Sequence, residues 1–534
     1  MPAVPRQPAH PTDPPQTQAR LSPADIRSII TGLMLAILLG ALDQTVISVS
    51  LPQMATDLQG VDLLAWVVSG YLIAMAVATP VYGKLGDIYG RRTVLSSAIV
   101  LFLVASVACA LAPSMPVLVA ARIMQGLGGG GLISVAQATI ADVVAPRERG
   151  RYQAYISGAF AVASVSGPVV GGLLTTHLSW RWVFWINLPL GLLALLVSRR
   201  ALAKLKKPSV RRKVDYLGAG LLTAGLTGVL LSITLIGRGQ ALDDTGTWWL
   251  LGTTVFALGT YGRHALRTAE PIIPLALFRN RTVTVSCLVT FLAFIQLLSM
   301  TVLVPLKLQM LAGLDADGAA LRLIPFSLSV PLGAYVGGKL MAKIGRYKYI
   351  QLTGTLIVPA ALMALSLTNA ESTVAMSLVL VGVGVGIGLQ LPTSTVAVQN
   401  AVPHHHMGVS TATVVFCRSL GSAIGISIQM AILMMALGVG AQLAGIELTG
   451  ADMIKLLIGH GDVGGEMHPL FAHGADTPGG GPGTHEVAAL EHIAHEAFSR
   501  VHRLAALVAL VPIALTMMLA DTRLSERTPP TAER

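Results

Sequence analysis

Charged residues are scarce in this chain. Asp, Glu, Lys and Arg make up 12% of its 534 residues, against roughly a quarter in soluble domains. Hydrophobic residues make up 53%, so a soluble fold would have too few charges to cover its surface. These proportions exclude the soluble, fibrous and disordered classes. They predict an all-α membrane protein with several spans, because each helical span needs about 20 consecutive apolar residues.

Cysteine is also scarce. Cys109, Cys287 and Cys417 are the three present, an odd number, and all lie in apolar stretches. A disulfide framework and a zinc site are therefore not expected. We interpret the three thiols as small buried side chains.

The apolar residues form fourteen stretches, which we predict to be fourteen transmembrane helices. Residues 1–28 are polar and Pro-rich and predict a disordered cytoplasmic tail, and residues 521–534 form a second tail. The stretches run over 29–52, 65–83, 94–112, 117–141, 152–174, 181–198, 216–236, 248–266, 282–306, 318–341, 349–368, 373–399, 408–438 and 501–520.

The basic residues alternate between the two sides of the membrane. Loops on one side, together with both tails, hold 28 of the 37 Lys and Arg residues, and eight of these lie between Arg199 and Lys213. By the positive-inside rule both termini are cytoplasmic. The net charge of +11 thus orients the chain in a prokaryotic cytoplasmic membrane, and we expect no nucleic-acid partner. The basic cluster also suits anionic membrane lipids.

A sequence repeat divides the chain into two halves. Gly83-Lys84-Leu85-Gly86 follows the second stretch, and Gly338-Lys339-Leu340 follows the tenth. We predict six-helix halves at 29–200 and 282–520, with a basic linker, two inserted helices and a connecting loop at 201–281. Two repeated halves with a substrate site between them near the membrane midplane are a transporter arrangement.

Residues 439–500 are predicted to form one long outward loop, with a potential helix from His485 to Arg500. Seven of the thirteen histidines fall in 460–502, and His492 and His495 can share a helix face. No tight ligand set stands out, so we predict no metal site. We interpret this segment as a solvated, pH-sensitive loop.

The spans contain few ionisable side chains, and such groups inside the hydrocarbon are costly and usually functional. Asp43 lies in the first span, Arg122 in the fourth and Arg418 in the thirteenth. Counted from Pro52 and Pro116 at ~1.5 Å per residue, Asp43 and Arg122 both fall in the outward half of the membrane. They can therefore pair, or compete through water.

A carboxylate that is buried alone holds its proton more tightly than one beside an arginine. If Asp43 alternates between these two environments, it takes up and releases a proton in each cycle. A static ion pair that fixes helix packing is the alternative.

Small residues mark two spans. One face of the fourth span has i, i+3, i+4, i+7 spacing and combines polar side chains with residues that allow close helix approach: Arg122, Gln125, Gly126 and Gly129. The fifth span predicts a bend or a sliding surface, with pure packing as the alternative, from Gly158, Gly167, Pro168, Gly171 and Gly172.

Five motifs, in order and on matching spans, resemble those of the major facilitator superfamily, and specifically of its fourteen-span drug:proton antiporters. They are Leu42-Asp43-x-Thr45-Val46, Gly83 to Arg92, Arg122 to Gly129, Ala163-x3-Gly167-Pro168-x2-Gly171-Gly172 and Trp180 to Pro189. The resemblance implies a fold of two six-helix halves plus two inserted helices.

The resemblance also implies roles for individual residues. The loop motif, which includes Gly83 and Gly90, would switch the conformation. Asp87, Arg91 and Arg92 would latch the halves in the outward-facing state, with Asp142 as a neighbouring partner. Gly167, Pro168 and Gly171 would belong to the antiporter motif of the fifth span.

We therefore expect proton-coupled export of amphipathic or cationic small molecules by alternating access, driven by the proton gradient without a cofactor. Asp43 is expected to carry the proton and Arg122 to tune its proton affinity. Candidate walls of the substrate cavity, each with helix packing as the alternative, are Gln44, Gln125, Gln296, Met300, Gln390, Gln429 and Arg418.

Export of one defined molecule, such as a lipid, siderophore, peptide or metabolite, with the same coupling stays open. A sensor or scaffold would need neither the membrane carboxylate nor the repeated loop motif. An enzyme is not expected, because no nucleophile–base pair or metal set appears in the spans. The expected partners are a small-molecule substrate, protons and lipids, and the chain is expected to be a monomer.

Overall fold

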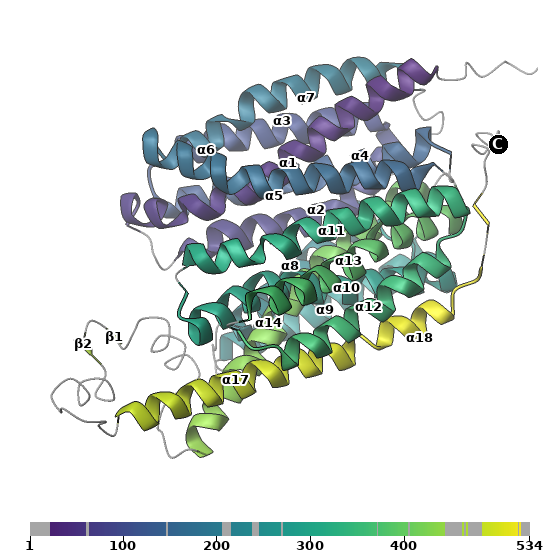
Figure 1. Ribbon diagram of the computed structural model, residues 1–534. Coiled ribbons are helices and arrows are strands. Elements are labelled where there is room, and N and C mark those ends of the chain that lie inside the picture. Colours follow the sequence, from purple (N-terminus) through teal and green to yellow (C-terminus); the bar gives the residue numbers. More distant parts are fainter. Residues whose placement is uncertain are drawn as a thin grey trace, which may run out of the picture.

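The computed structural model describes residues 22–59, 63–145, 148–205, 215–237, 245–268, 271–314, 316–370, 372–403, 406–443, 462–463, 466–467, 483–521 and 523–524. Long helices run side by side through the described part of the chain and form two bundles (Figure 1).

The N-terminal bundle contains the first seven helices. Its closest pairs are α2 with α4, α3 with α4 and α1 with α5. The bounds are α1 Pro23–Asp57, α2 Leu64–Tyr89, α3 Arg91–Ala110, α4 Met115–Val143, α5 Arg149–His177, α6 Trp182–Trp185 and α7 Asn187–Ala201, followed by the 3-10 turn η2 at Leu202–Lys204.

The C-terminal bundle is built in the same way, with α11 on α13, α10 on α14 and α12 on α13 as its closest pairs. The bounds are α10 Arg281–Ala312, α11 Ala316–Ile344, α12 Lys348–Leu367, α13 Thr373–Ala401, α14 Met407–Leu443, α17 Gly483–Val508 and α18 Val511–Met517, with two short paired strands, β1 Asp462–Val463 and β2 Glu466–Met467.

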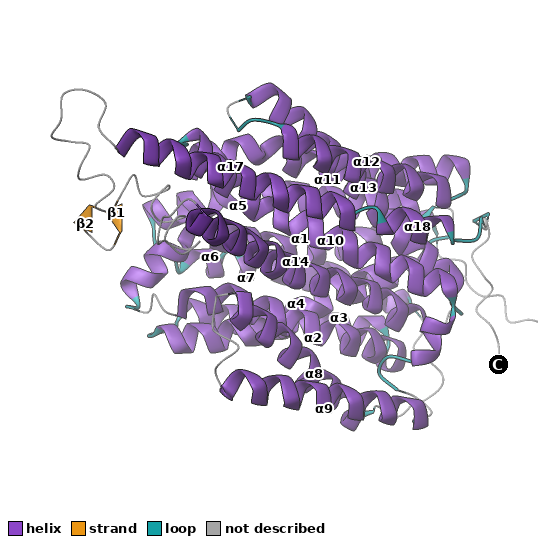
Figure 2. Ribbon diagram, turned by 90° about the horizontal axis from the view of Figure 1, so that it is seen from below, coloured by secondary structure: helices purple, strands orange, loops and turns teal. Residues whose placement is uncertain are grey.

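Between the bundles in sequence come α8 Tyr216–Gly237, α9 Thr245–Arg267 and the 3-10 turn η3 Leu275–Arg279. α8 and α9 pack on each other, and α8 also contacts α2 and α14. Figure 2 shows the pair along one edge of the molecule. The pair therefore lies outside the two bundles, against one helix from each.

A helix lies at each of the fourteen apolar stretches. Within the described residues, eleven helices are long and apolar enough to cross a membrane, counting Trp182–Lys204 and Ala489–Met517 as one each. α8 has a shorter apolar segment, Tyr216–Val229. The described part of the chain is thus an all-helical membrane protein with about eleven candidate spans, and the number fourteen stays a prediction.

The last span begins earlier than predicted. α17 starts at Gly483 and runs without a break through 501, where the sequence analysis placed the start of the span. Leu490, Ala494 and Phe498 on this helix are buried, with the i, i+4 spacing of an apolar face. Residues 489–500 therefore fall within the candidate span Ala489–Met517, and their place outside the membrane stays a prediction.

Several predicted features lie outside the described residues. They are the N-terminal tail before residue 22, the basic linker at 206–214, most of the predicted loop at 444–482 and the end of the C-terminal tail from 525.

The two bundles meet through small residues. α11 packs against α5, and α14 packs against α2 and α4. A Cβ atom added to Gly150 of α5 would lie 2.7 Å from the carbonyl oxygen of Gly338 on α11. The absence of a side chain at both positions therefore allows the two backbones to touch, which is the use of small residues between membrane helices.

We predict that Gly128→Ala destabilises the protein whereas Gly158→Ala does not. A Cβ at Gly128 would lie 2.7 Å from the backbone nitrogen of Phe102, while nothing lies within 4 Å of a Cβ at Gly158. Overpacking costs about 1–3 kcal/mol, whereas a helical Gly→Ala change without a clash gains about 1 kcal/mol. Thermal unfolding of the purified variants checks the opposite signs. Equal melting temperatures for the two variants would contradict the packing of α4 on α3.

Candidate functional site

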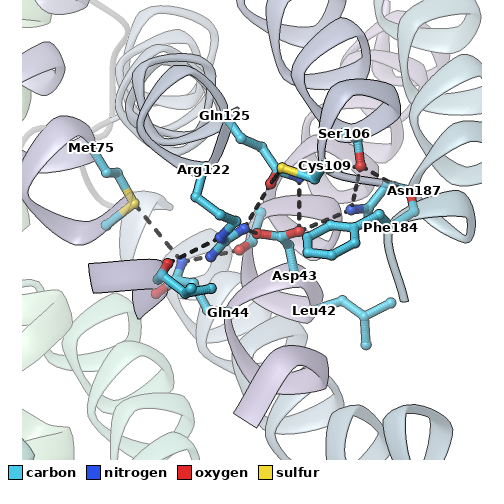
Figure 3. Close-up of polar contacts among 12 residues, drawn as sticks. Leu42, Asp43, Gln44, Met75, Ser106, Cys109, Arg122, Gln125, Phe184 and Asn187 are labelled. Atoms are coloured by element: carbon cyan, nitrogen blue, oxygen red, sulfur yellow. Dashed lines mark hydrogen bonds and ion pairs between the residues drawn. The ribbon is translucent and has the colours of Figure 1, made fainter. Parts of the chain in front are cut away.

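Asp43 on α1 and Arg122 on α4 form a buried ion pair. Arg122 Nη1 lies 2.8 Å from Asp43 Oδ2, and each residue is 1% exposed. Of the two arrangements that the sequence left open, pairing or competition through water, the structure contains the direct pair (Figure 3).

Two side-chain amides complete the surroundings of the carboxylate. Gln125 Nε2 and Asn187 Nδ2 each donate to Asp43 Oδ1 at 2.9 Å. Asn187 also donates to Ser106 Oγ at 3.0 Å. Asp43 thus accepts three hydrogen bonds from side chains on α4 and α7.

Arg122 has further partners on α2 and α4. Its Nε donates to the carbonyl of Val67 at 3.2 Å, and its Nη1 donates to Gln125 Oε1 at 2.7 Å. Its guanidinium carbon lies 4.1 Å from the centre of the Tyr71 ring, a cation–π distance. The arginine is therefore held between two helices and a ring, as well as by its counter-ion.

Asn187 and Ser106 are site residues that the sequence analysis did not single out. Asn187 lies within the Trp180 to Pro189 motif, at the start of α7, and Ser106 is fully buried in α3. A polar side chain inside an apolar stretch was the available signal for Ser106. The sequence alone does not show that either side chain faces Asp43, because this depends on how α3 and α7 are rotated about their axes.

The loop motif forms a second charged cluster that joins the two bundles. Arg91 donates to Asp87 Oδ1 at 2.6 Å and to Asp142 Oδ2 at 2.7 Å. Asp87 in turn accepts from the backbone nitrogens of Gly408 and Val409 at 3.2 and 3.1 Å. These nitrogens are at the start of α14, where the helix dipole favours a negative charge.

The glycines of the loop motif allow the close approach of α2 to the start of α14 and the turn between α2 and α3. A Cβ at Gly83 would collide with Gly408 and Ala412 of α14, so the two helices approach closely here. Gly90 has φ 86 between α2 and α3, a left-handed conformation that glycine adopts without steric strain. Arg92 differs from the prediction: it is exposed and makes no hydrogen bond or ion pair within the described residues.

The glycines of α5 pack against α1 next to Asp43. A Cβ at Gly167 would collide with Thr45, and one at Gly171 with the carbonyl of Val46. Thr45 Oγ1 also donates to the Ala163 carbonyl at 2.8 Å. α5 is one continuous helix through Pro168, so the glycines provide tight packing here, and a sliding role stays a prediction.

The seven predicted cavity residues fall into three groups. Gln44 and Gln125 lie near Asp43, and Gln44 Nε2 donates to the Gly40 carbonyl at 3.0 Å. Four lie in the C-terminal bundle, where Gln429 donates to Gln296 at 3.1 Å, Gln390 donates to its own helix and Met300 is fully buried in an apolar cluster. Arg418 is half-buried beside the Phe294 ring. The described contacts of the C-terminal four residues are thus with their own bundle, and their place in a cavity wall stays a prediction.

We predict that Asp87→Asn weakens the contact between the bundles. The change removes a charge from the start of α14 and from the Arg91 pair, and a charged hydrogen bond contributes about 1.5–3 kcal/mol. A cysteine placed at buried Thr411 of α14, with the native cysteines replaced, should react about tenfold faster with a thiol reagent in the variant. Glu148→Gln, an exposed change near the same end, is the control. Equal labelling rates would count against the latch.

Comparison with known proteins identifies the family. Residues 33–426 match the Major Facilitator Superfamily. The multidrug transporter protein MdtP of Bacillus subtilis is 32% identical over 411 residues, 76% of this chain and 75% of that protein. The efflux pump FUS6 of Gibberella moniliformis is 29% identical over 428 residues, 78% of this chain and 76% of that protein.

A solved structure agrees in fold. The proton:xylose symporter XylE has a TM-score of 0.57 and 18% identity, with 92% of this chain and 96% of XylE covered. At this identity the likeness concerns the fold alone. The family match and the 32% identical relative show that the chain belongs to the major facilitator superfamily and is a transporter, not an enzyme.

Proposed function

We propose that this transporter is a proton-coupled antiporter that exports amphipathic drugs or toxic compounds by alternating access. The observation that carries the proposal is the buried Asp43, the single acidic residue in the fourteen apolar stretches, held by three hydrogen-bond donors. Relatives named as multidrug transporters and efflux pumps support export as the direction of transport.

Asp43 has the chemistry of a proton carrier. Its ionised form is stabilised by Arg122, Gln125 and Asn187, so a proton that binds Oδ2 must displace the Arg122 guanidinium, which lies 2.8 Å away. Displacement leaves the Arg122 guanidinium buried without its counter-ion, which is unfavourable in free energy. Protonation is therefore linked to a rearrangement of α1 against α4. Proton uptake and helix movement are thereby coupled at one pair of residues.

The second charged cluster supports the alternating-access part of the proposal. Asp87, Arg91 and Asp142 tie the end of α2 to α3, α4 and the start of α14. Breaking this contact exposes the charges to water at that end of the molecule. Their hydration then offsets part of the free energy lost with the ion pairs and hydrogen bonds. A contact of this kind can open and close in each cycle.

We further propose a subfamily, an oligomeric state, a membrane and an orientation for this transporter. The chain belongs to the fourteen-span branch of the superfamily and acts as a monomer in a prokaryotic cytoplasmic membrane, with both termini in the cytoplasm. The alternation of Lys and Arg between loops supports this orientation. The basic cluster from Arg199 to Lys213 is suited to anionic lipid headgroups on the same side.

We predict that Asp43→Asn abolishes proton-driven transport. Purified protein in liposomes with an imposed pH difference should accumulate a neutral amphipathic dye such as a naphthylamine, and the variant should fall to the level of protein-free liposomes. Asp25→Asn is the matched control, because Asp25 is on the same helix but at its polar end, paired with Lys204, where an exposed pair contributes little.

Loss of folding is a separate explanation for an inactive variant. An unpaired Arg122 is destabilising, since breaking a buried pair costs about 3–5 kcal/mol. The double variant Asp43→Asn with Arg122→Gln removes both charges and should recover a wild-type melting temperature without recovering transport. Wild-type uptake by Asp43→Asn would eliminate the proton-carrier role. A panel of substrates on wild-type protein separates a broad exporter from a specialist.

A further inference from the structure

Arg418 is a charged side chain placed near the middle of the membrane. It lies on α14 eleven residues after Met407, where the helix begins beside Asp87. At ~1.5 Å per residue this is about 16 Å from that end, half of a hydrocarbon core of about 30 Å. Its depth therefore matches the midplane region where transporters of two repeated halves bind substrate.

The rotation of α14 about its axis directs Arg418 to the seam, which is the boundary where α14 lies between the N-terminal bundle and α10. Val415 packs into the apolar cluster of the N-terminal bundle, and a Cβ at Gly421 would collide with Phe291 on α10. At 100° per residue, Arg418 points between these two directions. Its guanidinium carbon lies 4.7 Å from the centre of the Phe294 ring on α10, and the residue is half-buried.

The guanidinium of Arg418 has no oxygen partner within the described residues. It contacts the Phe294 ring. Three fully buried cations differ from Arg418: Arg122 pairs with Asp43, Arg149 Nη2 donates to the Ala141 carbonyl at 2.7 Å, and Lys307 Nζ donates to the Thr368 carbonyl at 3.0 Å. Five donor hydrogens and a full charge at Arg418 are thus left for another molecule.

The fourteen apolar stretches offer no free acid to neutralise this charge. Asp43 is the single acidic residue in the fourteen apolar stretches, and both of its oxygens already accept from Arg122, Gln125 and Asn187. A cationic substrate at the seam would therefore meet repulsion from Arg418 and no compensating carboxylate. An anionic group would meet a planar donor that binds carboxylate, sulfonate or phosphate through two parallel hydrogen bonds.

We propose that Arg418 binds the anionic group of the transported molecule, whose apolar body lies along Phe294. The substrate class is thus amphipathic organic anions, narrower than the amphipathic or cationic molecules expected from the sequence. The inference rests on the proposed export function, because it assigns the substrate of the same transport cycle. Repulsion of cations and attraction of anions both contribute to the selectivity.

A series of three probes with one fluorophore tests the charge preference. Dansylglycine is anionic, dansylamide neutral and dansylcadaverine cationic near pH 7. Equilibrium binding to purified wild-type protein, measured by fluorescence anisotropy without any gradient, should follow that order of decreasing affinity. Arg418→Gln should lower the ratio of dansylglycine to dansylamide affinity by about tenfold or more, the effect of one charged hydrogen bond. Arg418→Lys should retain part of the ratio.

Arg500→Gln is the control, because it removes one positive charge from an exposed position of α17, where Arg500 pairs with Glu496, far in sequence from Arg418. Its affinity ratio should equal that of the wild type. Melting temperature and gel-filtration profile establish that each variant is folded. Wild-type ratios in Arg418→Gln overturn the proposal, as does wild-type protein that prefers dansylcadaverine or binds none of the three probes.

The outcomes separate this site from the proposed function. The binding assay uses no proton gradient, so a failure of proton coupling leaves its result intact. Conversely, proton-driven uptake that depends on Asp43 but shows no preference among the three charges would preserve the antiport function and remove Arg418 as the anion site.

Discussion

The buried pair of Asp43 and Arg122 is the constraint on which the N-terminal bundle depends. Taking each charge out of water costs several kcal/mol, and the attraction between them compensates only when the remaining lone pairs and protons are satisfied. Gln125, Asn187 and the Val67 carbonyl satisfy them here. Because these partners come from α2, α4 and α7, the solvation requirement of one ion pair fixes how four helices are placed.

The two charged clusters of the N-terminal bundle stand in different surroundings. The Asp43 pair is enclosed on all sides, whereas the Asp87 cluster lies at the end of α2, against the start of α14. A change at the enclosed pair must be compensated within the protein, while the end cluster can exchange its partners for water. The first is therefore suited to storing a proton, and the second to a contact that breaks and re-forms.

Much of the helical architecture could be predicted from the sequence. Apolar stretches located the helices, and counting residues from Pro52 and Pro116 placed Asp43 and Arg122 at similar depth. Depth along a helix follows from its rise, but the neighbours of a side chain depend on how each helix is rotated and packed. For that reason the pairing of Asp43 with Arg122 stayed one of two alternatives, and Asn187 was not singled out.

The same limit explains the differences in the C-terminal bundle. Met300 was expected in a cavity wall because it is soft and lies in a span, yet it is enclosed among the side chains of its own bundle. Gln296 and Gln429 were selected because they are polar, but the sequence does not show that Gln429 donates a hydrogen bond to Gln296. The candidate span that ends at Met517 starts before the predicted one because pairs of apolar residues are separated by pairs of polar residues in 489–500, and a search for continuous apolar runs misses this pattern. The family resemblance implied a latch role for Arg92. Its exposure depends on how α3 is rotated, which a motif in the sequence does not show.

The proposed anion site at Arg418 and the proposed proton antiport together have an electrical consequence. With an anion leaving the cell as a proton enters, each turnover moves two elementary charges in the direction that an inside-negative membrane potential favours. Each charge gains about 2.3 kcal/mol per 100 mV, so voltage alone would drive such a pump, and it would continue to work where the inner and outer pH are equal. An exporter of monovalent cations with the same proton count moves no net charge and has no such reserve.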